Sequence, residues 1–107
     1  MDWKNSEKRV ARHAFDAALQ RELATVMAEF KRRAAATKEP DDLWNTEAYL
    51  TRMRKDIDAK YDYRYSQLVM VFARLMRDGF VTEQELDGLS EDKLEFIRRF
   101  GTPAPEA

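Results

Sequence analysis

Hydrophobic side chains recur every three or four positions in the first third of the chain, which is the spacing of one face of an α-helix. This stripe consists of Phe15, Leu19, Leu23, Val26 and Phe30. Asn5 and Ser6 precede the stripe, and their side-chain oxygens can accept hydrogen bonds from the free backbone amides at a helix start. The pattern predicts a helix from about Ser6 to Ala35.

A second stripe of similar spacing follows Pro40, which disfavours helical geometry at the residue before it. It consists of Leu43, Leu50, Ile57, Tyr61, Leu68, Phe72 and Leu75. The two aspartates after Pro40 can cap the next helix and suit the positive end of its dipole. Gly79 can take the left-handed conformation that ends a helix. We therefore expect a helix from Asp42 to about Asp78, with a break near Tyr65-Ser66 as the alternative.

Two shorter helices are predicted in the last quarter of the chain. Thr82 and Glu85 have the T-x-x-E spacing of a capping box, which starts the first of them. Ser90 can cap the second, with Leu89 and Leu94 at the positions of a hydrophobic staple.

These elements predict an all-α fold in a single domain, residues 1–107. Residues 6–78 are expected to form a stalk of two long antiparallel helices, 80–100 a small helical head and 101–107 a flexible tail. A helix of roughly 36 residues is about 54 Å long, whereas a compact domain of this size has a radius of gyration of about 13 Å. The longer helix therefore overhangs a monomeric core, and we expect a helical-bundle homodimer to cover its apolar stripe.

Composition narrows the classes of function. Of 107 residues, 19 are basic and 20 acidic, so the chain lacks the concentrated positive charge that nucleic-acid binding requires. The basic clusters 31–33 and 52–55 have acidic neighbours and fit solvated helix faces. Cysteine is absent, and no stretch is long and apolar enough to insert into a membrane. A cytoplasmic protein without nucleic-acid or membrane partners is expected.

The residue types that carry catalysis or bind metals are sparse. His13 is the only histidine and has no assignable partner for acid–base chemistry or metal ligation. Asp58 and Asp62 share a helical face, but Asp56 does not, and no oxygen-rich loop surrounds them. We therefore expect no catalytic residue, no metal site and no cofactor, and a binding protein rather than an enzyme.

Aromatic and basic residues alternate along the second predicted helix. They are Trp44, Tyr49, Tyr61, Tyr63 and Tyr65, interleaved with Arg52, Arg54 and Arg64. One interpretation is core packing supported by cation–π contacts. The other is a protein-binding surface, because Trp, Tyr and Arg are the usual anchors of interfaces. The residues alone favour the two interpretations equally, although the run 61–65 has too many rings for one buried stripe.

The same segment resembles the fluorescence recovery protein family of cyanobacteria. The matching residues are Asp41-Asp42-Leu43-Trp44, Tyr49-Leu50, Arg54, Ile57-Asp58, Lys60-Tyr61-Asp62, Arg64, Phe72-Ala73, Leu75 and Gly79. The first helix matches more loosely, through Phe15 and Gln20-Arg21-Glu22-Leu23. The resemblance covers roughly residues 10–100.

The resemblance implies a non-enzymatic, all-helical homodimer with a stalk and a head. Its partner would be the orange carotenoid protein or a homologue of that protein's C-terminal domain. The resemblance implies that this chain speeds the return of the partner from its red, photoactivated form to its orange form. It also implies that this chain helps to release the partner from the phycobilisome. The implied dimer-interface residues are Leu43, Trp44, Leu50 and Arg54. The implied partner-binding residues are Trp44, Arg54, Met70, Phe72 and Phe96.

One departure from the family pattern lies beside these residues. Glu47 and Ala48 stand where familiar members carry His-Asp, and a methyl group at position 48 cannot accept a hydrogen bond. This favours an alternative: a helical dimer of the same fold that serves a different, unknown protein partner in a bacterium without phycobilisomes.

Overall fold

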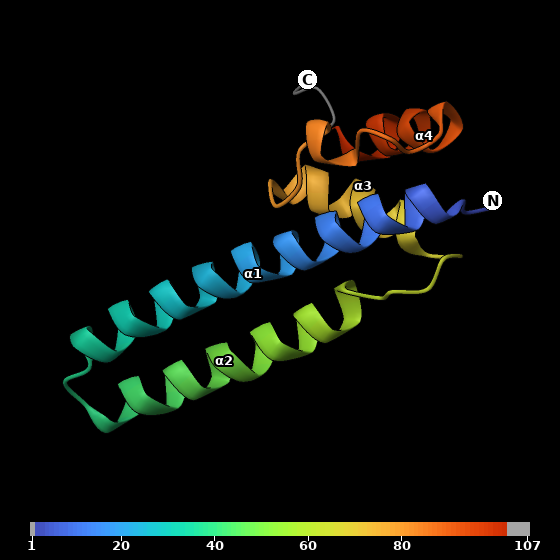
Figure 1. Cartoon of the computed structure of the whole chain (residues 1–107). Coiled ribbons are helices and arrows are strands. Elements are labelled where there is room, and N and C mark those ends of the chain that lie inside the picture. Colours follow the sequence, from blue (N-terminus) through green and yellow to red (C-terminus); the bar gives the residue numbers. More distant parts are fainter. Residues whose placement is uncertain (1, 103–107) are drawn as a thin grey trace, which may run out of the picture.

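The computed structural model describes residues 2–102, which contain five helical segments and no β-strand. The segments are α1 (Asn5–Ala36), α2 (Pro40–Lys60), α3 (Leu68–Asp78), the short 3₁₀ helix η1 (Gln84–Leu86) and α4 (Glu91–Gly101) (Figure 1). The prediction of an all-α fold is therefore confirmed. Most of the predicted tail, residues 103–107, lies outside the described residues, whereas Gly101 is buried at the end of α4.

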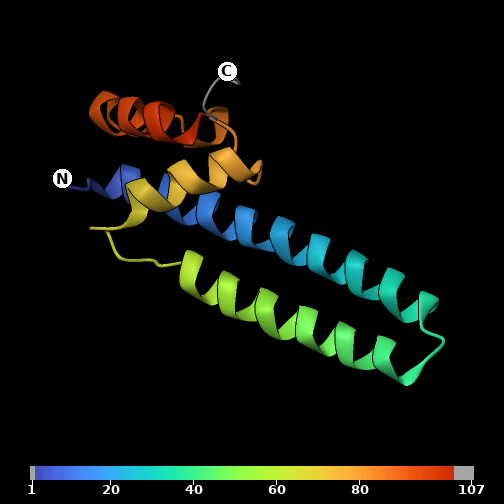
Figure 2. The same ribbon diagram turned by 180° about the vertical axis from the view of Figure 1, so that it is seen from behind.

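α1 and α2 lie side by side and run antiparallel, forming a hairpin that projects from the rest of the chain (Figures 1 and 2). The helix starts agree with the prediction to within two residues, but the capping residues differ. Lys4 is the N-cap of α1, and Glu39, rather than either aspartate, is the N-cap of α2. The Asp42 carboxylate instead accepts hydrogen bonds from the backbone amides of Lys38 (2.9 Å) and Glu39 (3.0 Å). It thereby closes the turn between the helices.

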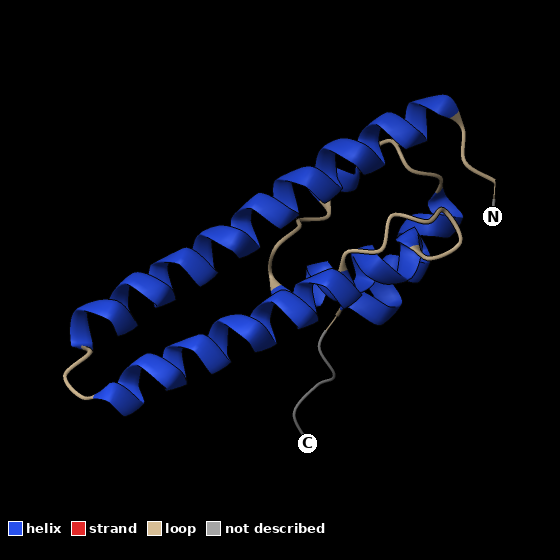
Figure 3. Cartoon of the chain, turned by 90° about the horizontal axis from the view of Figure 1, so that it is seen from below, coloured by secondary structure: helices blue, strands red, loops and turns tan. Residues whose placement is uncertain are grey.

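The second helix ends at Lys60, so the prediction of one continuous helix from Asp42 to Asp78 is wrong. Residues 61–67 form a loop (tan in Figure 3), and a new helix begins at Leu68. Tyr65 and Ser66 lie within this loop, so the alternative of a break near them is confirmed, although the helix already ends at Lys60. The break shortens the hairpin, and with it the overhang that favoured a dimer.

Aromatic packing explains why the helix ends there. The rings of Tyr61 and Tyr63 both lie edge-on to Phe15 of α1, with ring centroids 5.3 and 4.8 Å away. Residues two apart in a helix point in nearly opposite directions, whereas in an extended segment they share a side. Only the loop conformation lets both rings reach Phe15.

The head consists of α3, η1 and α4, packed on the N-terminal half of α1. Its fully buried large side chains are Leu68, Phe72, Leu75, Leu86 and Ile97. α1 meets them with Ala11, Ala14 and Ala18, which are completely buried and small enough for close approach. α1 therefore serves both units, because its C-terminal half pairs with α2 and its N-terminal half with the head (Figure 2).

The helix start and end signals predicted for the head are confirmed by the local geometry. Gly79 ends α3 with a φ of 85°, in the left-handed region. Thr82 and Glu85 exchange hydrogen bonds between side chain and backbone of 3.1 and 3.3 Å, although the element they start is a 3₁₀ helix. Ser90 is the N-cap of α4, and both leucines of the predicted staple are buried.

Candidate functional site

The outer part of the hairpin exposes large apolar side chains from both helices. This apolar face consists of the exposed Leu23, Met27, Phe30 and Leu43 together with the half-buried Leu50. Met27 is 57% exposed and Leu43 is 53% exposed. Phe30, Leu43 and Leu50 line a groove of about 380 Å³ between the helices. A large apolar patch left in water is characteristic of a contact surface.

The predicted interface residues of α2 gather beside this groove. Leu43, Leu50 and Arg54 are spaced by seven and four positions, so they share one helix face. Trp44 and Ala48 lie on the adjoining face, where the indole of Trp44 is 61% exposed. The structure thus has three of the four predicted dimer-interface residues on one face of α2 and Trp44 on the adjoining face. It also leaves the ring of Trp44 open to water.

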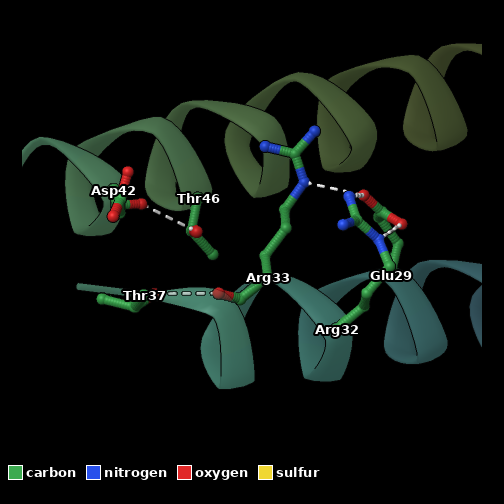
Figure 4. Close-up of polar contacts among 6 residues, drawn as sticks. All are labelled: Glu29, Arg32, Arg33, Thr37, Asp42 and Thr46. Carbon is green, nitrogen blue, oxygen red and sulfur yellow. Dashed lines mark hydrogen bonds and ion pairs between the residues drawn. The ribbon is translucent and has the colours of Figure 1, made fainter. Parts of the chain in front are cut away.

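Near the tip of the hairpin, polar contacts form within each helix (Figure 4). The Glu29 carboxylate accepts hydrogen bonds from Arg32 and, at 3.0 Å, from Arg33. These two guanidinium groups lower the pKa of Glu29 to about 2. Arg33 also lies over the ring of Tyr49 on α2, 4.4 Å from its centroid. The threonine Thr37 donates to the carbonyl of Arg33 at 2.8 Å, which caps the end of α1.

The head carries a second exposed surface, the head groove. This groove has a volume of about 290 Å³, and Met70, Arg74, Arg77 and Phe100 are among its lining residues. Met70 is 54% exposed, so its side chain is accessible from solvent. Phe100 was not foreseen as a site residue. Its signal in the sequence was its position one helical turn after Phe96, whose ring lies 4.5 Å away.

Phe72 and Phe96, the other two predicted partner-binding residues of the head, are less exposed than Met70. Phe72 is 0% exposed and packed in the core of the head, so its ring does not lie on the surface of the chain, where a partner would contact it. Its position in the stripe of α3 already placed it on the inward face. Phe96 is half-buried and packs against the core from outside.

A buried charge cluster joins the hairpin to the head. The Lys60 ammonium group lies 2.6 Å from the Glu22 carboxylate of α1 and 3.0 Å from Asp78 at the end of α3. The hydroxyl of Tyr61 donates to Glu22 at 2.9 Å. Burial and this hydrogen bond both raise the pKa of Tyr61 well above its usual value. A lone buried charge is costly, so each member of the cluster depends on the others.

A second buried ion pair holds the start of α1 against α4. The Glu7 carboxylate accepts hydrogen bonds from Lys93 (2.8 Å) and from the backbone amides of Ser90 (2.9 Å) and Lys4 (3.0 Å). Burial alone would raise the pKa of Glu7, but these donors lower it to about 2. Sequence periodicity missed both buried clusters, because it detects apolar spacing and not polar pairs formed by distant segments.

The loop between α2 and α3 packs its tyrosines on α1 and on the N-terminus. The guanidinium of Arg12 lies 3.7 Å from the ring centroid of Tyr63, and Trp3 donates from its indole nitrogen to the carbonyl of Tyr65 at 3.1 Å. Core packing with cation–π support is therefore the correct interpretation for Tyr61 and Tyr63. Tyr65 stays 41% exposed, which confirms that the run has more rings than the core can bury.

A metal site in a protein needs several ligand side chains close together. Within residues 2–102, no group of three or more His, Cys, Asp or Glu side chains could hold a metal ion. His13 is exposed, and Asp62 accepts hydrogen bonds from Arg64. None of the helices described here is long and apolar enough to span a bilayer.

Comparisons with known proteins identify relatives over nearly the whole chain. A sequence profile of the family described as photoprotection regulator fluorescence recovery protein matches residues 3–100. The chain is 38% identical over 96 residues to the fluorescence recovery protein of Synechocystis sp., covering 90% of this chain and 88% of that protein. The solved structure of the Fremyella diplosiphon fluorescence recovery protein matches with a TM-score of 0.88 at 38% identity, covering 92% of this chain and 97% of that one. The solved Synechocystis structure also gives 0.88, at 36% identity with the same coverage.

Proposed function

The chain belongs to the fluorescence recovery protein family of photoprotection regulators, and from this we propose that it is a homodimeric, non-enzymatic regulator of the orange carotenoid protein. It binds that protein or a homologue of its C-terminal domain. Binding speeds the return from the red form to the orange form and promotes release from the phycobilisome. The cytoplasmic location expected from the sequence is part of this proposal.

The apolar face supports the dimer. Leu43 and Met27 expose more than half of their surfaces, and burying such side chains contributes about 1.5 to 3 kcal/mol each. A two-fold axis lets the same face serve both partners, because a residue of one copy then meets the same surface on the other.

The exposed indole of Trp44 is the observation that carries the partner assignment. Tryptophan and arginine are the commonest anchors of protein interfaces, and Trp44 lies beside the face that carries Arg54. The groove around Met70 supplies a second contact surface on the head. Contacts at both ends would let one partner span the hairpin and the head.

Regulation of this kind requires differential binding. A protein that binds both conformers of its partner equally does not change the equilibrium between them, however tightly it binds. Acceleration requires that the regulator bind the barrier state of the conversion more tightly than the red form. Helices suit this, because they fix the backbone positions from which the exposed side chains project.

The test is a relaxation assay. Photoactivated orange carotenoid protein is mixed with increasing amounts of this protein, and the red-to-orange decay is followed by absorbance. We expect acceleration in the wild type. Trp44→Ala should weaken it about thirtyfold in apparent affinity, the effect of losing a contact of about 2 kcal/mol. Asn45→Ala, an exposed neighbour on the same helix, is the control and should act like the wild type. Unchanged decay and no complex at high concentration would refute the proposal.

The methyl group at position 48 favours a second candidate function. Ala48 is exposed on the same face of α2 as Trp44, where it offers a partner no charge and no hydrogen bond. A partner other than the orange carotenoid protein could fit this altered surface. Co-purification from the native host, compared between wild type and Trp44→Ala, separates the two functions by the identity of the captured protein.

A further inference from the structure

A basic groove lies on the N-terminal half of α1. Its volume is about 390 Å³, and two tyrosines of the loop, Tyr63 and Tyr65, form part of its lining. The α1 residues that line it are Lys8, Arg9, Arg12, His13 and Asp16. These positions are spaced by one, three, one and three, so they form one helix face opposite the buried alanines.

Charge is distributed unevenly around this groove. Three basic side chains and one histidine line the groove with a single carboxylate, Asp16, whereas the whole chain has a net charge of −1. Asp16 lies 3.4 Å from one nitrogen of Arg12. A guanidinium group has five N–H donors, so the contact with Asp16 leaves Arg12 able to bind a second carboxylate.

The tyrosine rings hold the cations in place. Arg12 lies 3.7 Å from the ring centroid of Tyr63, and Lys8 lies 5.0 Å from that of Tyr65. The loop is itself anchored, since Trp3 contacts the carbonyl of Tyr65 and Phe15 contacts the ring of Tyr63. A ligand therefore meets two positive groups, Lys8 and Arg12, that tyrosine rings already contact, which reduces the entropy lost on binding.

We propose that this groove binds an acidic peptide segment of a protein partner. The carboxylates of the segment pair with Arg9 and Arg12, and an apolar or aromatic side chain between them packs on the exposed ring of Tyr65. The groove is confined to about two turns of one helix, so it lacks the extended basic path that a nucleic-acid backbone needs. The proposal deepens the proposed function to the extent that the segment belongs to the regulated protein.

The probe is a synthetic peptide of eight residues, mostly glutamate with one central tyrosine, added to the ¹⁵N-labelled protein at physiological salt. Amide and arginine side-chain shifts are followed by NMR, which detects binding into the millimolar range. We expect saturable shifts confined to residues 8–16 and 63–65. Arg9→Glu should weaken binding about tenfold, because it removes one favourable exposed charge contact and adds an unfavourable one.

The matched control is Lys31→Glu, which makes the same charge change at an exposed position on the same helix. It should change the affinity by less than about twofold, as expected for a screened, distant charge. Equal weakening by both variants, or shifts spread along the hairpin, would overturn the proposal. So would tighter binding of a short DNA duplex or of inorganic phosphate at the same residues.

The experiment separates this proposal from the proposed function because it contains no carotenoid protein. Peptide binding with no effect on red-to-orange decay leaves the groove assignment standing and refutes the regulator assignment. Accelerated decay without peptide binding supports the regulator assignment and refutes the groove assignment. Arg12→Lys adds a further check, since it keeps the charge but loses the flat stack on Tyr63, and it should weaken peptide binding severalfold.

Discussion

The ammonium group of Lys60 lies 2.6 Å from the Glu22 carboxylate, and both side chains are almost completely buried where the hairpin meets the head. The pair bridges α2 to α1, and through Asp78 it reaches α3. A single change at Lys60 therefore affects three helices at once.

Lys60→Met should lower the free energy of unfolding by about 3 to 5 kcal/mol, because Glu22 is left buried without its cation. Urea denaturation followed by circular dichroism measures the change. Lys38→Met, at an exposed lysine in the hairpin turn, should shift the same quantity by less than about 0.5 kcal/mol. Equal effects would show that the buried pair contributes nothing specific.

Glu7 should make the protein sensitive to acid. Its folded-state pKa of about 2 lies below the ordinary value of 4.5, so the folded state favours the charged form. The resulting stabilisation, about 3 kcal/mol, is complete above about pH 5 and is lost as the pH falls through about 2. Glu7→Gln should therefore be less stable than the wild type at neutral pH, and the difference should shrink over this range.

Glu29→Gln is the control for that experiment. Its pKa is lowered to a similar value by two arginines, but the carboxylate lies in a solvated cluster at the hairpin tip. Solvent screening should make the effect on unfolding smaller than that of Glu7→Gln. Identical pH profiles for the two variants would contradict the importance of burial.

Leu43→Glu should convert the proposed dimer to a monomer, because it places a charge in an apolar contact at a cost of several kcal/mol. Light scattering after size exclusion reports the mass. Asn45→Glu adds the same charge at an exposed position two residues away and should remain dimeric. A wild-type monomer at micromolar concentrations would rule out the dimer itself.

Ala48→Asp should speed relaxation of the carotenoid partner if the missing carboxylate limits activity. The helix should keep its content by circular dichroism, because position 48 is exposed on α2. Ala48→Asn introduces a side chain with the shape of aspartate but without its charge, so it separates a charge effect from a shape effect. A faster decay with Asn as well would assign the gain to shape, and no gain with Asp would point to the head residues.

Much of the fold could be predicted because apolar spacing and end signals agree over α1 and at Gly79. A break near Tyr65 and Ser66 could be foreseen only as an alternative, and its start directly after Lys60 could not, because Tyr61 and Leu68 both continue a helical spacing from Ile57. The residues that end the helix do so through contacts with Phe15, more than forty positions away. Local periodicity contains no information about such contacts.

The candidate site could be predicted in part. Exposure of Leu43, Trp44 and Met70 agrees with contact roles implied by the family resemblance. Phe72 did not agree, because a stripe residue and a surface aromatic look alike when only residue types are compared. The basic groove combines α1 with a loop fifty positions later, so it becomes visible only in three dimensions.

The distance along the chain between Glu7 and Lys93 has a consequence for biosynthesis. The two residues are 86 positions apart, so the start of α1 stays without its ion partner until nearly the whole chain has been made. The α1–α2 hairpin needs only the first 60 residues and can form earlier on the ribosome. Closure of the head is thus the last step, and a truncated product would keep the hairpin's apolar face while lacking the element that secures its N-terminus.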